Sequence, residues 1–432
     1  MRRLTGSALA LVLITTACSL ARSPDDPSRS PSPSETGSPR PSVEVRTGET
    51  TALQAMRRLC AEVDTTAAPA ESDPTPPAIA EVERQVEAVR GLEFERPVNV
   101  DPVSPEEIDR RLARYFDDYY PRAPYARRTL AWRTIGAIPP GIGILEALRR
   151  YQQGQVLGYY NSQNGELVYT GDDQLSRIEQ FILAHELTHA VDDQHYDLDR
   201  LDVLSNTCDD ERFLAALGVV EGSANHFATE VIVRFPISEI GEIPGGGAQG
   251  VPPIITQIQA YPYTSGQVFV DHLVEEGGVR AVNAALRRFP VSTEEVLHPE
   301  RFGKDEPTEV DVPDFGPTFG EGWRDLDVMM AGELWLRVLL DTGTTTQEAS
   351  AAAAGWDGGI YRAWTDGEEA AVILSTTWDT PIEAAEFRGA LTRWIGDRRD
   401  RTFIEGQGSV VIAGFATGKE LMPALESAIR SM

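Results

Sequence analysis

A His-Glu-Leu-Thr-His run at residues 185–189 constrains the fold of this chain more than any other feature. In an α-helix, residues four apart lie on the same face one turn above each other, so the imidazoles of His185 and His189 can bind one metal ion. The flanking residues are apolar or uncharged, and neither proline nor glycine interrupts them. The pattern predicts a buried helix over 181–191 that carries a pair of metal ligands.

Glu186 gives this helix a catalytic interpretation. A zinc ion lowers the pKa of a bound water to about 7, and a carboxylate beside the first histidine can take the proton and pass it to a leaving amine. The alternative is a structural helix with two incidental histidines, but two of the chain's six histidines fall in this run with Glu186 between them. We therefore expect Zn²⁺ as the cofactor and Glu186 as a general base.

A third metal ligand is expected from a second helix. Residues 211–233 are compatible with a helix, and Glu221 lies within it, followed by the small residue Gly222. Small residues would let this helix pack close to the first one and bring the Glu221 carboxylate to the metal. Asp192 and His226 are competing third ligands, the first on the histidine helix and the second on the helix of Glu221.

His185-Glu-x-x-His189 followed by Glu221-Gly-x-Ala224 resembles the gluzincin metallopeptidases, the thermolysin-like group in which a glutamate is the third zinc ligand. The chain is also similar to uncharacterised bacterial HExxH lipoproteins of that superfamily, over about residues 150–340. The similar segments are His185-Glu-Leu-Thr-His-Ala-Val-Asp-Asp-Gln-His-Tyr-Asp-Leu198, Tyr261-Pro-Tyr-Thr-Ser-Gly266 and Ser292-Thr-Glu-Glu-Val-Leu-His-Pro299. The resemblance implies a zincin-like fold, zinc bound by His185, His189 and Glu221, and a peptide or protein substrate.

The tetrahedral intermediate of peptide hydrolysis needs a second electrophile beside zinc. Tyr261, Tyr263 and His298 are the candidates, since all three lie outside the two metal-binding helices. Gluzincins often place a tyrosine or a histidine in this role. The sequence does not distinguish among the three, so all of them remain catalytic candidates.

A β-hairpin is predicted just before the metal-binding helix. Residues 155–160 and 166–170 are strand-like and flank Asn164-Gly165, a dipeptide typical of tight hairpins. By analogy with gluzincins, a strand at this position forms the upper wall of the cleft, where an extended peptide can pair with its edge. A hairpin that merely ends the sheet is the alternative.

The first residues predict export. A positively charged start is followed by an apolar stretch that ends at Cys18, in the arrangement of a bacterial lipoprotein signal. We expect residues 1–17 to be a signal peptide and a lipid on Cys18 to anchor the protein at the extracytoplasmic face of the cell membrane. Residues 18–77, rich in serine and proline, would form a disordered tether. A plain secreted protein is the alternative.

The number of cysteines indicates a disulfide, and the net charge limits which classes of molecule the protein can bind. With Cys18 lipidated, Cys60 and Cys208 would remain to form one disulfide in an exported protein. The formal net charge of −28, from 67 acidic and 39 basic residues, argues against nucleic acid as a partner. The expected partners are therefore a peptide or protein substrate and the membrane that holds the lipid.

The expected fold class is α+β. A mostly helical, zincin-like domain over 78–345 would include helices near 264–288 and 325–342. A smaller α+β unit over 346–432 would follow, with strands near 371–378 and 409–415 and helices near 381–396 and 419–431.

The expected function is a membrane-anchored, extracytoplasmic zinc metallopeptidase. The alternative is a catalytically inactive zincin-fold lipoprotein that acts as a binding or scaffold module. The presence of Glu186 favours the enzyme, because a structural zinc site has no use for a general base.

Overall fold

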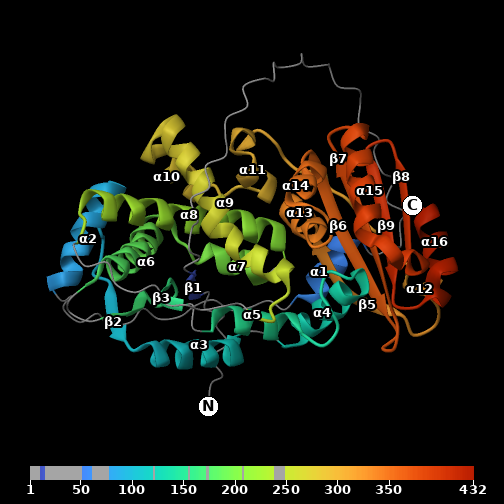
Figure 1. Cartoon of the computed structure of the whole chain (residues 1–432), viewed down its shortest axis with the longest axis horizontal. Coiled ribbons are helices and arrows are strands. Elements are labelled where there is room, and N and C mark those ends of the chain that lie inside the picture. The colour runs from blue at the N-terminus through green and yellow to red at the C-terminus, as the bar shows by residue number, and fades with distance from the viewer. Residues whose placement is uncertain are drawn as a thin grey trace.

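The computed structural model describes residues 10–14, 51–60, 77–119, 122–153, 156–171, 175–206, 209–237 and 249–432. These residues form an α+β protein whose two ends differ in architecture (Figure 1). Helices surround a small sheet in the N-terminal part, whereas a five-stranded antiparallel sheet forms the centre of the C-terminal part. The α+β class expected from the sequence is confirmed.

Three long helices form the centre of the N-terminal part: α6 (Arg177–Tyr196), α8 (Asp210–Arg234) and α9 (Pro253–Gly277). Helix α8 packs against both α6 and α9, and α2 (Pro77–Arg90) packs against α6 and α8. Helix α6 begins after a capping box, in which the side chains of Ser176 and Glu179 each accept the backbone N–H of the other residue. The helices predicted over 181–191 and 211–233 are confirmed.

The small sheet lies against α6. Strands β3 (Val156–Asn161) and β4 (Glu166–Thr170) form the predicted hairpin, with Gly165 at a φ of 70° in the turn. Strand β2 (Asn99–Val103) pairs parallel with β4, and β1 (Ala10–Ile14) pairs antiparallel with the other edge of β3. Helices α6 and α3 (Pro105–Tyr119) both pack on β3 and β4.

The five-stranded sheet has the order β5-β6-β7-β9-β8 and is antiparallel throughout. Its strands are β5 (Arg324–Met330), β6 (Trp356–Thr365), β7 (Ala370–Trp378), β8 (Thr402–Gln407) and β9 (Val410–Ala416). Alternate residues of β7 enter two different cores: Val372 and Leu374 join the core that includes α15 (Pro381–Ile395), and Ile373 joins the core that includes α16 (Met422–Arg430). Both helices and strands β7 and β9 were predicted, and they are confirmed.

The single helix expected over 325–342 is wrong in its first half. Residues Arg324–Met330 form β5, and helix α13 (Glu333–Asp341) begins only after Gly332. A continuous apolar run does not by itself distinguish a buried strand from a buried helix. Antiparallel pairing with β6 makes the first half a strand, so the C-terminal sheet includes residues that precede position 346.

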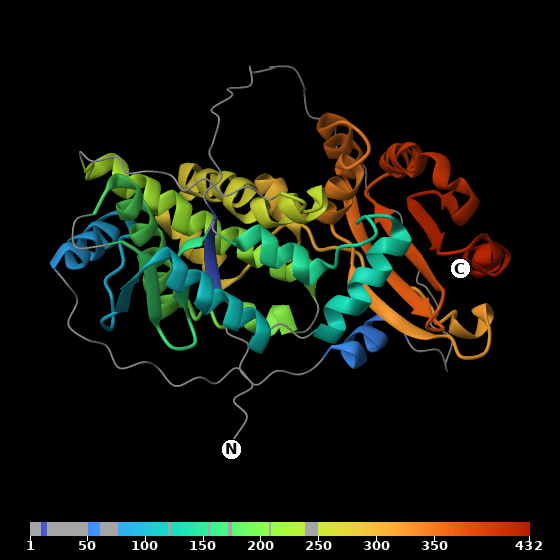
Figure 2. The same cartoon turned by 60° about the horizontal axis from the view of Figure 1, so that its bottom comes forward.

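Helix α4 (Arg122–Ile135) joins the two parts of the molecule (Figure 2). It packs on β5, β7 and β9, and the indole N–H of Trp132 donates to the hydroxyl of Tyr361 at 3.1 Å. Arg128 forms ion pairs with Asp210 of α8 at 2.9 Å and with Asp327 of β5 at 2.5 Å. The two parts are therefore connected by buried polar contacts as well as by apolar packing.

An ordered helix, α1 (Ala52–Leu59), lies inside the segment expected to be a disordered tether. Ala52, Ala55 and Met56 are buried, and the helix packs on β5. Cys60, which follows it, is disulfide-bonded. Cys18 and Cys208 lie outside the described residues, so the lipid anchor and the Cys60–Cys208 pairing stay predictions.

Shorter elements complete the described part of the chain. The helices are α5 (Ile144–Gln152), α7 (Arg200–Asn206), α10 (Val279–Arg287), α11 (Thr293–Leu297), α12 (Gly316–Phe319) and α14 (Thr346–Ala353), with 3₁₀ turns at Pro299–Arg301, Gly396–Arg401 and Lys419–Leu421. No helix among the described residues combines the length and the apolar character needed to cross a bilayer.

Candidate metal centre

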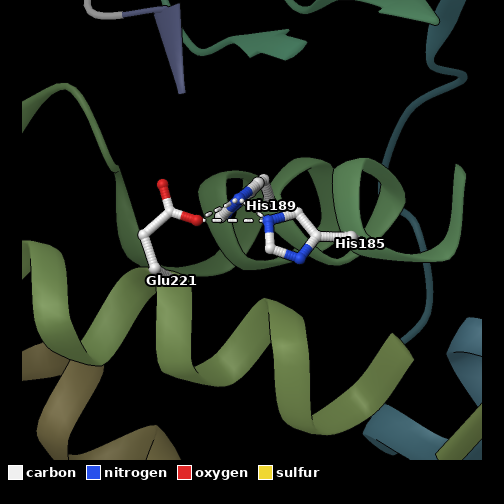
Figure 3. Close-up of side chains that lie close together, drawn as sticks. All are labelled: His185, His189 and Glu221. Carbon is white, nitrogen blue, oxygen red and sulfur yellow. Dashed lines mark hydrogen bonds and ion pairs between the residues drawn. The ribbon is translucent and has the colours of Figure 1, made fainter. Parts of the chain in front are cut away.

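Helices α6 and α8 bring three buried side chains to one point (Figure 3). His185 and His189 extend from α6, and Glu221 extends from α8. The Glu221 Oε2 atom lies 3.1 Å from Nε2 of His185 and 3.5 Å from Nε2 of His189, and the two Nε2 atoms are 3.0 Å apart. Within the described part of the chain this group has the ligand types, spacing and burial to hold a metal ion.

The local sequence explains how each histidine is presented. His185 and His189 are four positions apart, so their rings meet on one face of α6 with centroids 4.6 Å apart. Thr188, between them, donates its hydroxyl to the carbonyl of Ala184 at 2.7 Å and so has no free polar group in the core. Residues on all faces of α6 around the histidines are buried, because the small sheet, α2 and α8 surround the helix.

The two competing third ligands have other partners. Asp192 accepts hydrogen bonds from Arg90 and Ser223, both at 2.7 Å. His226 lies on a different face of α8, with Nδ1 2.6 Å from a carboxylate oxygen of Asp271. Of the three carboxylate and imidazole candidates, Glu221 is therefore the one that meets the histidine pair.

The protonation states of His185 and Glu221 suit metal binding. Burial lowers the pKa of His185 to about 4, despite the opposing hydrogen bond with Glu221. Burial would raise the pKa of Glu221, but the charge of His189 and hydrogen bonds with both histidines lower it to about 2. At neutral pH the site therefore presents a neutral imidazole at His185 and an ionised carboxylate, the forms that bind a metal ion.

Glu186 lies next to the ligand group and has no partner for its charge. It is fully buried, and neither carboxylate oxygen has a hydrogen-bond partner among the described residues. Burial, followed by the charge of Glu221, raises the pKa of Glu186 well above its usual value. A buried carboxylate without hydrogen bonds is costly for a fold to keep, and a proton acceptor beside a metal is one role that requires it.

Gly158 of β3 allows Glu186 to lie against the sheet. A Cβ atom at position 158 would lie 2.9 Å from Cγ2 of Ile182 and 3.2 Å from Cγ of Glu186. Any larger side chain would therefore press on the turn of α6 that carries the carboxylate. A role for Gly158 was not predicted from the sequence, although an isolated glycine inside a predicted strand indicates a close approach of another element.

Tyr263 is the electrophile candidate that lies at the site. Its ring stacks on that of His185 with centroids 6.3 Å apart and an interplanar angle of 27°. Asn225, one turn after Glu221, donates its side-chain amide to the carbonyl of Tyr263 at 3.1 Å. Burial and then the charges of Glu221 and Glu186 raise the pKa of Tyr263 well above its usual value, so the hydroxyl keeps its proton.

Tyr261 and His298 lie in a second buried cluster. The Tyr261 hydroxyl is buried without a hydrogen-bond partner, and burial, then the charges of Glu211 and Glu333, raise its pKa. Nε2 of His298 lies 3.0 Å from Oε1 of Glu333, at the start of α13. The structure therefore separates these two candidates from Tyr263.

Gly222 serves a different contact from the one expected. The sequence predicts that Gly222 lies at the contact between the two metal-binding helices, but in the structure it faces α9. A Cβ at Gly222 would overlap the carbonyl of Gly266 in α9, and a Cβ at Gly266 would overlap the carbonyl of Gly218 in α8. These three glycines let the backbones of α8 and α9 touch, which sets the distance between Glu221 and Tyr263.

Comparison with known proteins adds one finding. A domain of unknown function, DUF8575, matches residues 322–420. This range starts just before β5 and includes all five strands of the C-terminal sheet, but it does not reach the metal-binding helices. No curated protein matches the chain, and no solved structure does.

Proposed function

We propose that this protein is a zinc metallopeptidase of the gluzincin type, with a zincin-like N-terminal part. One observation carries the proposal: His185, His189 and Glu221 converge within 3.5 Å of one another, from two helices, beside a buried Glu186 without hydrogen bonds. Two imidazoles and one carboxylate are the protein ligands of several catalytic zinc sites. A purely structural zinc site tends to have four protein ligands and needs no adjacent free carboxylate.

The residues have separate roles in this proposal. His185, His189 and Glu221 would hold the ion. Zinc in such a site acts as a Lewis acid and makes water a stronger nucleophile at neutral pH. Glu186 would accept the proton of the attacking water on one carboxylate oxygen and return it to the leaving amine.

Tyr263 would stabilise the negative charge that develops on the scissile carbonyl oxygen. Its phenol keeps its proton and lies beside His185, so it can donate a hydrogen bond where charge forms. Tyr261 and His298 contact a different set of carboxylates. We therefore assign the electrophilic role to Tyr263.

The edge of β3 is the proposed docking strand for the substrate backbone. Strand β1 pairs antiparallel with β3 from Ala10↔Asn161 to Ile14↔Val156, so this edge can accept an extended chain. Gly158 lies in the middle of β3, directly over Glu186. If residues 1–17 are removed as a signal peptide, the edge becomes free for a substrate peptide in the place of β1.

Anchoring by a lipid on Cys18 at the extracytoplasmic face of the membrane is part of the proposal and follows from the lipoprotein-like N-terminus. The alternative function is a zincin-fold lipoprotein without activity, which binds or organises other proteins. The unpartnered Glu186 favours the enzyme, because a binding module gains nothing from this buried carboxylate.

Metal content and peptide cleavage together test the proposal. We expect about one zinc per chain in the wild-type protein, as in other sites with three protein ligands, and loss of zinc in Glu221→Ala. Glu186→Gln should keep the zinc but lose about 10²–10⁴-fold in the cleavage rate of an unfolded protein substrate. A wild-type protein that takes up no zinc would exclude the metallopeptidase, and zinc binding without any cleavage in the wild type would favour the scaffold alternative.

A further inference from the structure

A buried arginine at the end of α2 connects to both metal-binding helices. The Arg90 side chain is fully buried, and its Nε atom donates to Oδ1 of Asp192 in α6 at 2.7 Å. Its Nη1 atom donates to the side chain of Asn283 in α10 at 2.6 Å. The guanidinium carbon also lies 4.8 Å from the ring centroid of Phe227 in α8. Arg90 therefore contacts three helices besides its own.

Asp192 extends this contact from α6 to α8. Its second oxygen, Oδ2, accepts a hydrogen bond from the hydroxyl of Ser223 at 2.7 Å. Asp192 follows His189 by three residues, and Ser223 follows Glu221 by two. The polar link between the helices thus lies within one turn of the metal ligands on each side.

We propose that Arg90, Asp192 and Ser223 are positioning residues for the metal centre, an inference that rests on the proposed function. They fix the distance and the rotation of α8 relative to α6, so that the Glu221 carboxylate reaches both imidazoles. The hydrogen bonds of these side chains join them to one another and to Asn283, whereas those between the described metal ligands join only His185, His189 and Glu221. Their effect on the metal passes through the two helices.

The choice of residue types supports positioning over plain stabilisation. A buried ion pair adds little stability relative to apolar side chains of similar volume, because removing the charges from water is costly. Apolar packing, however, tolerates small rotations of one helix on another, whereas hydrogen bonds at 2.7 Å have preferred angles. Groups that orient metal ligands typically change metal affinity or activity about 10–100-fold when they are removed.

Two variants of the full-length protein separate the two roles. Ser223→Ala removes the hydroxyl that reaches Asp192 and leaves the ion pair with Arg90 intact. Arg90→Met/Asp192→Leu replaces the whole ion pair with apolar side chains and should restore much of the stability that either single change loses. Thr229→Ala is the matched control, because Thr229 donates its hydroxyl to the carbonyl of Asn225 within α8.

The measurements are zinc affinity by chelator competition, the visible absorption of the Co²⁺-substituted protein, and the melting temperature of the metal-free protein. We expect Ser223→Ala and the double variant to bind zinc about 10–100-fold more weakly and to change the Co²⁺ spectrum, even where the melting temperature equals that of the wild type. Thr229→Ala should bind zinc like the wild type.

The outcomes distinguish this inference from the proposed function. If the wild type binds zinc and both variants bind zinc as tightly as the wild type does, the positioning role is wrong and the metallopeptidase proposal stands. If zinc affinity merely follows the melting temperature through the whole series, the three residues are structural only. A wild type that binds neither zinc nor Co²⁺ would overturn both proposals.

Discussion

At the residue scale, the site is defined by two carboxylates on different helices in opposite electrostatic environments. Glu221 has hydrogen bonds with both histidines, which keep its pKa near 2. Glu186, one residue after His185, has no hydrogen-bond partner, and its pKa is raised by burial. The ionised Glu221 carboxylate suits the proposed ligand role, and the buried Glu186 beside it is the proposed general base.

The pair Tyr261 and Tyr263 offers a prediction at this scale. Tyr263→Phe removes the hydroxyl beside His185 and should lower kcat by about 10²–10³-fold, the range seen when one oxyanion donor is lost. The phenol is not a ligand, but it hydrogen-bonds to the ligand Glu221, so we expect zinc affinity to fall by at most about 10–100-fold, and kcat is compared at saturating zinc. The measurement is steady-state cleavage of a labelled peptide, together with chelator competition.

Tyr261→Phe is the matched control for that measurement. It removes a hydroxyl from the same helix, but one that is buried near Glu211 and Glu333 instead of the metal ligands. We expect wild-type kcat in this variant. Equal losses of kcat in the two variants would contradict the assignment of Tyr263 as the electrophile.

At the scale of elements, the contact of α8 with α9 depends on backbone contact at Gly218, Gly222 and Gly266. A helix usually packs through side chains at an interaxial distance of about 8–10 Å. Here the missing Cβ atoms allow a closer approach, which brings Tyr263 of α9 to the ligand group carried by α6 and α8. The separation of these two helices is therefore part of the site.

Gly266→Ala tests this dependence. The added methyl would overlap the carbonyl of Gly218 and push the helices apart, which we expect to lower the free energy of unfolding by about 1–3 kcal/mol and to lower kcat. Gly389→Ala in α15 is the control, since its Cβ would lie 3.4 Å from the flexible end of Arg393. In that helix alanine should be neutral or stabilise by up to about 1 kcal/mol. Urea denaturation measures both, and a neutral Gly266→Ala would exclude the close contact.

At the scale of the whole molecule, a buried chain of hydrogen bonds joins α8 to α11 and α13. Glu211, at the start of α8, accepts from the backbone N–H and the hydroxyl of Thr293 at 2.5 and 2.8 Å. The same hydroxyl accepts from the N–H of Leu334, at the start of α13. Burial raises the pKa of Glu211 to about 8, so this contact is sensitive to pH.

The free energy of unfolding should fall as the pH rises through the pKa of Glu211. In the unfolded chain Glu211 titrates near 4.5, and in the folded protein near 8, so the folded state binds more protons between these values. Its contribution is fully present below pH 4.5 and is lost as the pH rises through 8. Each unit of pKa difference corresponds to about 1.4 kcal/mol, so the loss amounts to a few kcal/mol.

The measurement is the free energy of unfolding in urea from pH 5 to 9. Glu211→Gln cannot ionise and should reduce the slope of stability against pH, because one of the raised carboxyl groups is gone. The exposed Glu386→Gln should keep the wild-type slope. A wild-type slope in Glu211→Gln would show that Glu211 does not titrate in this range.

The N-terminal segment gives a second prediction for the whole molecule. Cys60 is disulfide-bonded directly after α1, and α1 packs on the C-terminal sheet. If its partner is Cys208, a non-reducing digest will contain one peptide pair joined by that bond. Cys208→Ser should then lower the free energy of unfolding by about 2–4 kcal/mol. If Cys208→Ser has the same free energy of unfolding as the wild type, Cys208 is not the disulfide partner of Cys60.

Features that depend on neighbours a few residues apart could be predicted from the sequence. Helix periodicity put His185 and His189 on one face of α6, and Asn164-Gly165 formed the predicted hairpin turn. Helical pattern also placed Glu221 within a second helix. These features follow from local geometry, which a run of residues carries wherever it lies in a fold.

Contacts between residues far apart in the chain could not be predicted from the sequence and follow from the packing of the helices and strands. Tyr261 and Tyr263 are two residues apart in one helix and so point in different directions, and the packing of α8 determines which one reaches the metal ligands. Pairing with β6 made residues 324–330 a strand, although their apolar run also suits a helix. Gly158, Gly266 and Arg90 gain their roles from contacts with distant elements. No local pattern encodes such contacts, because they depend on how whole elements pack.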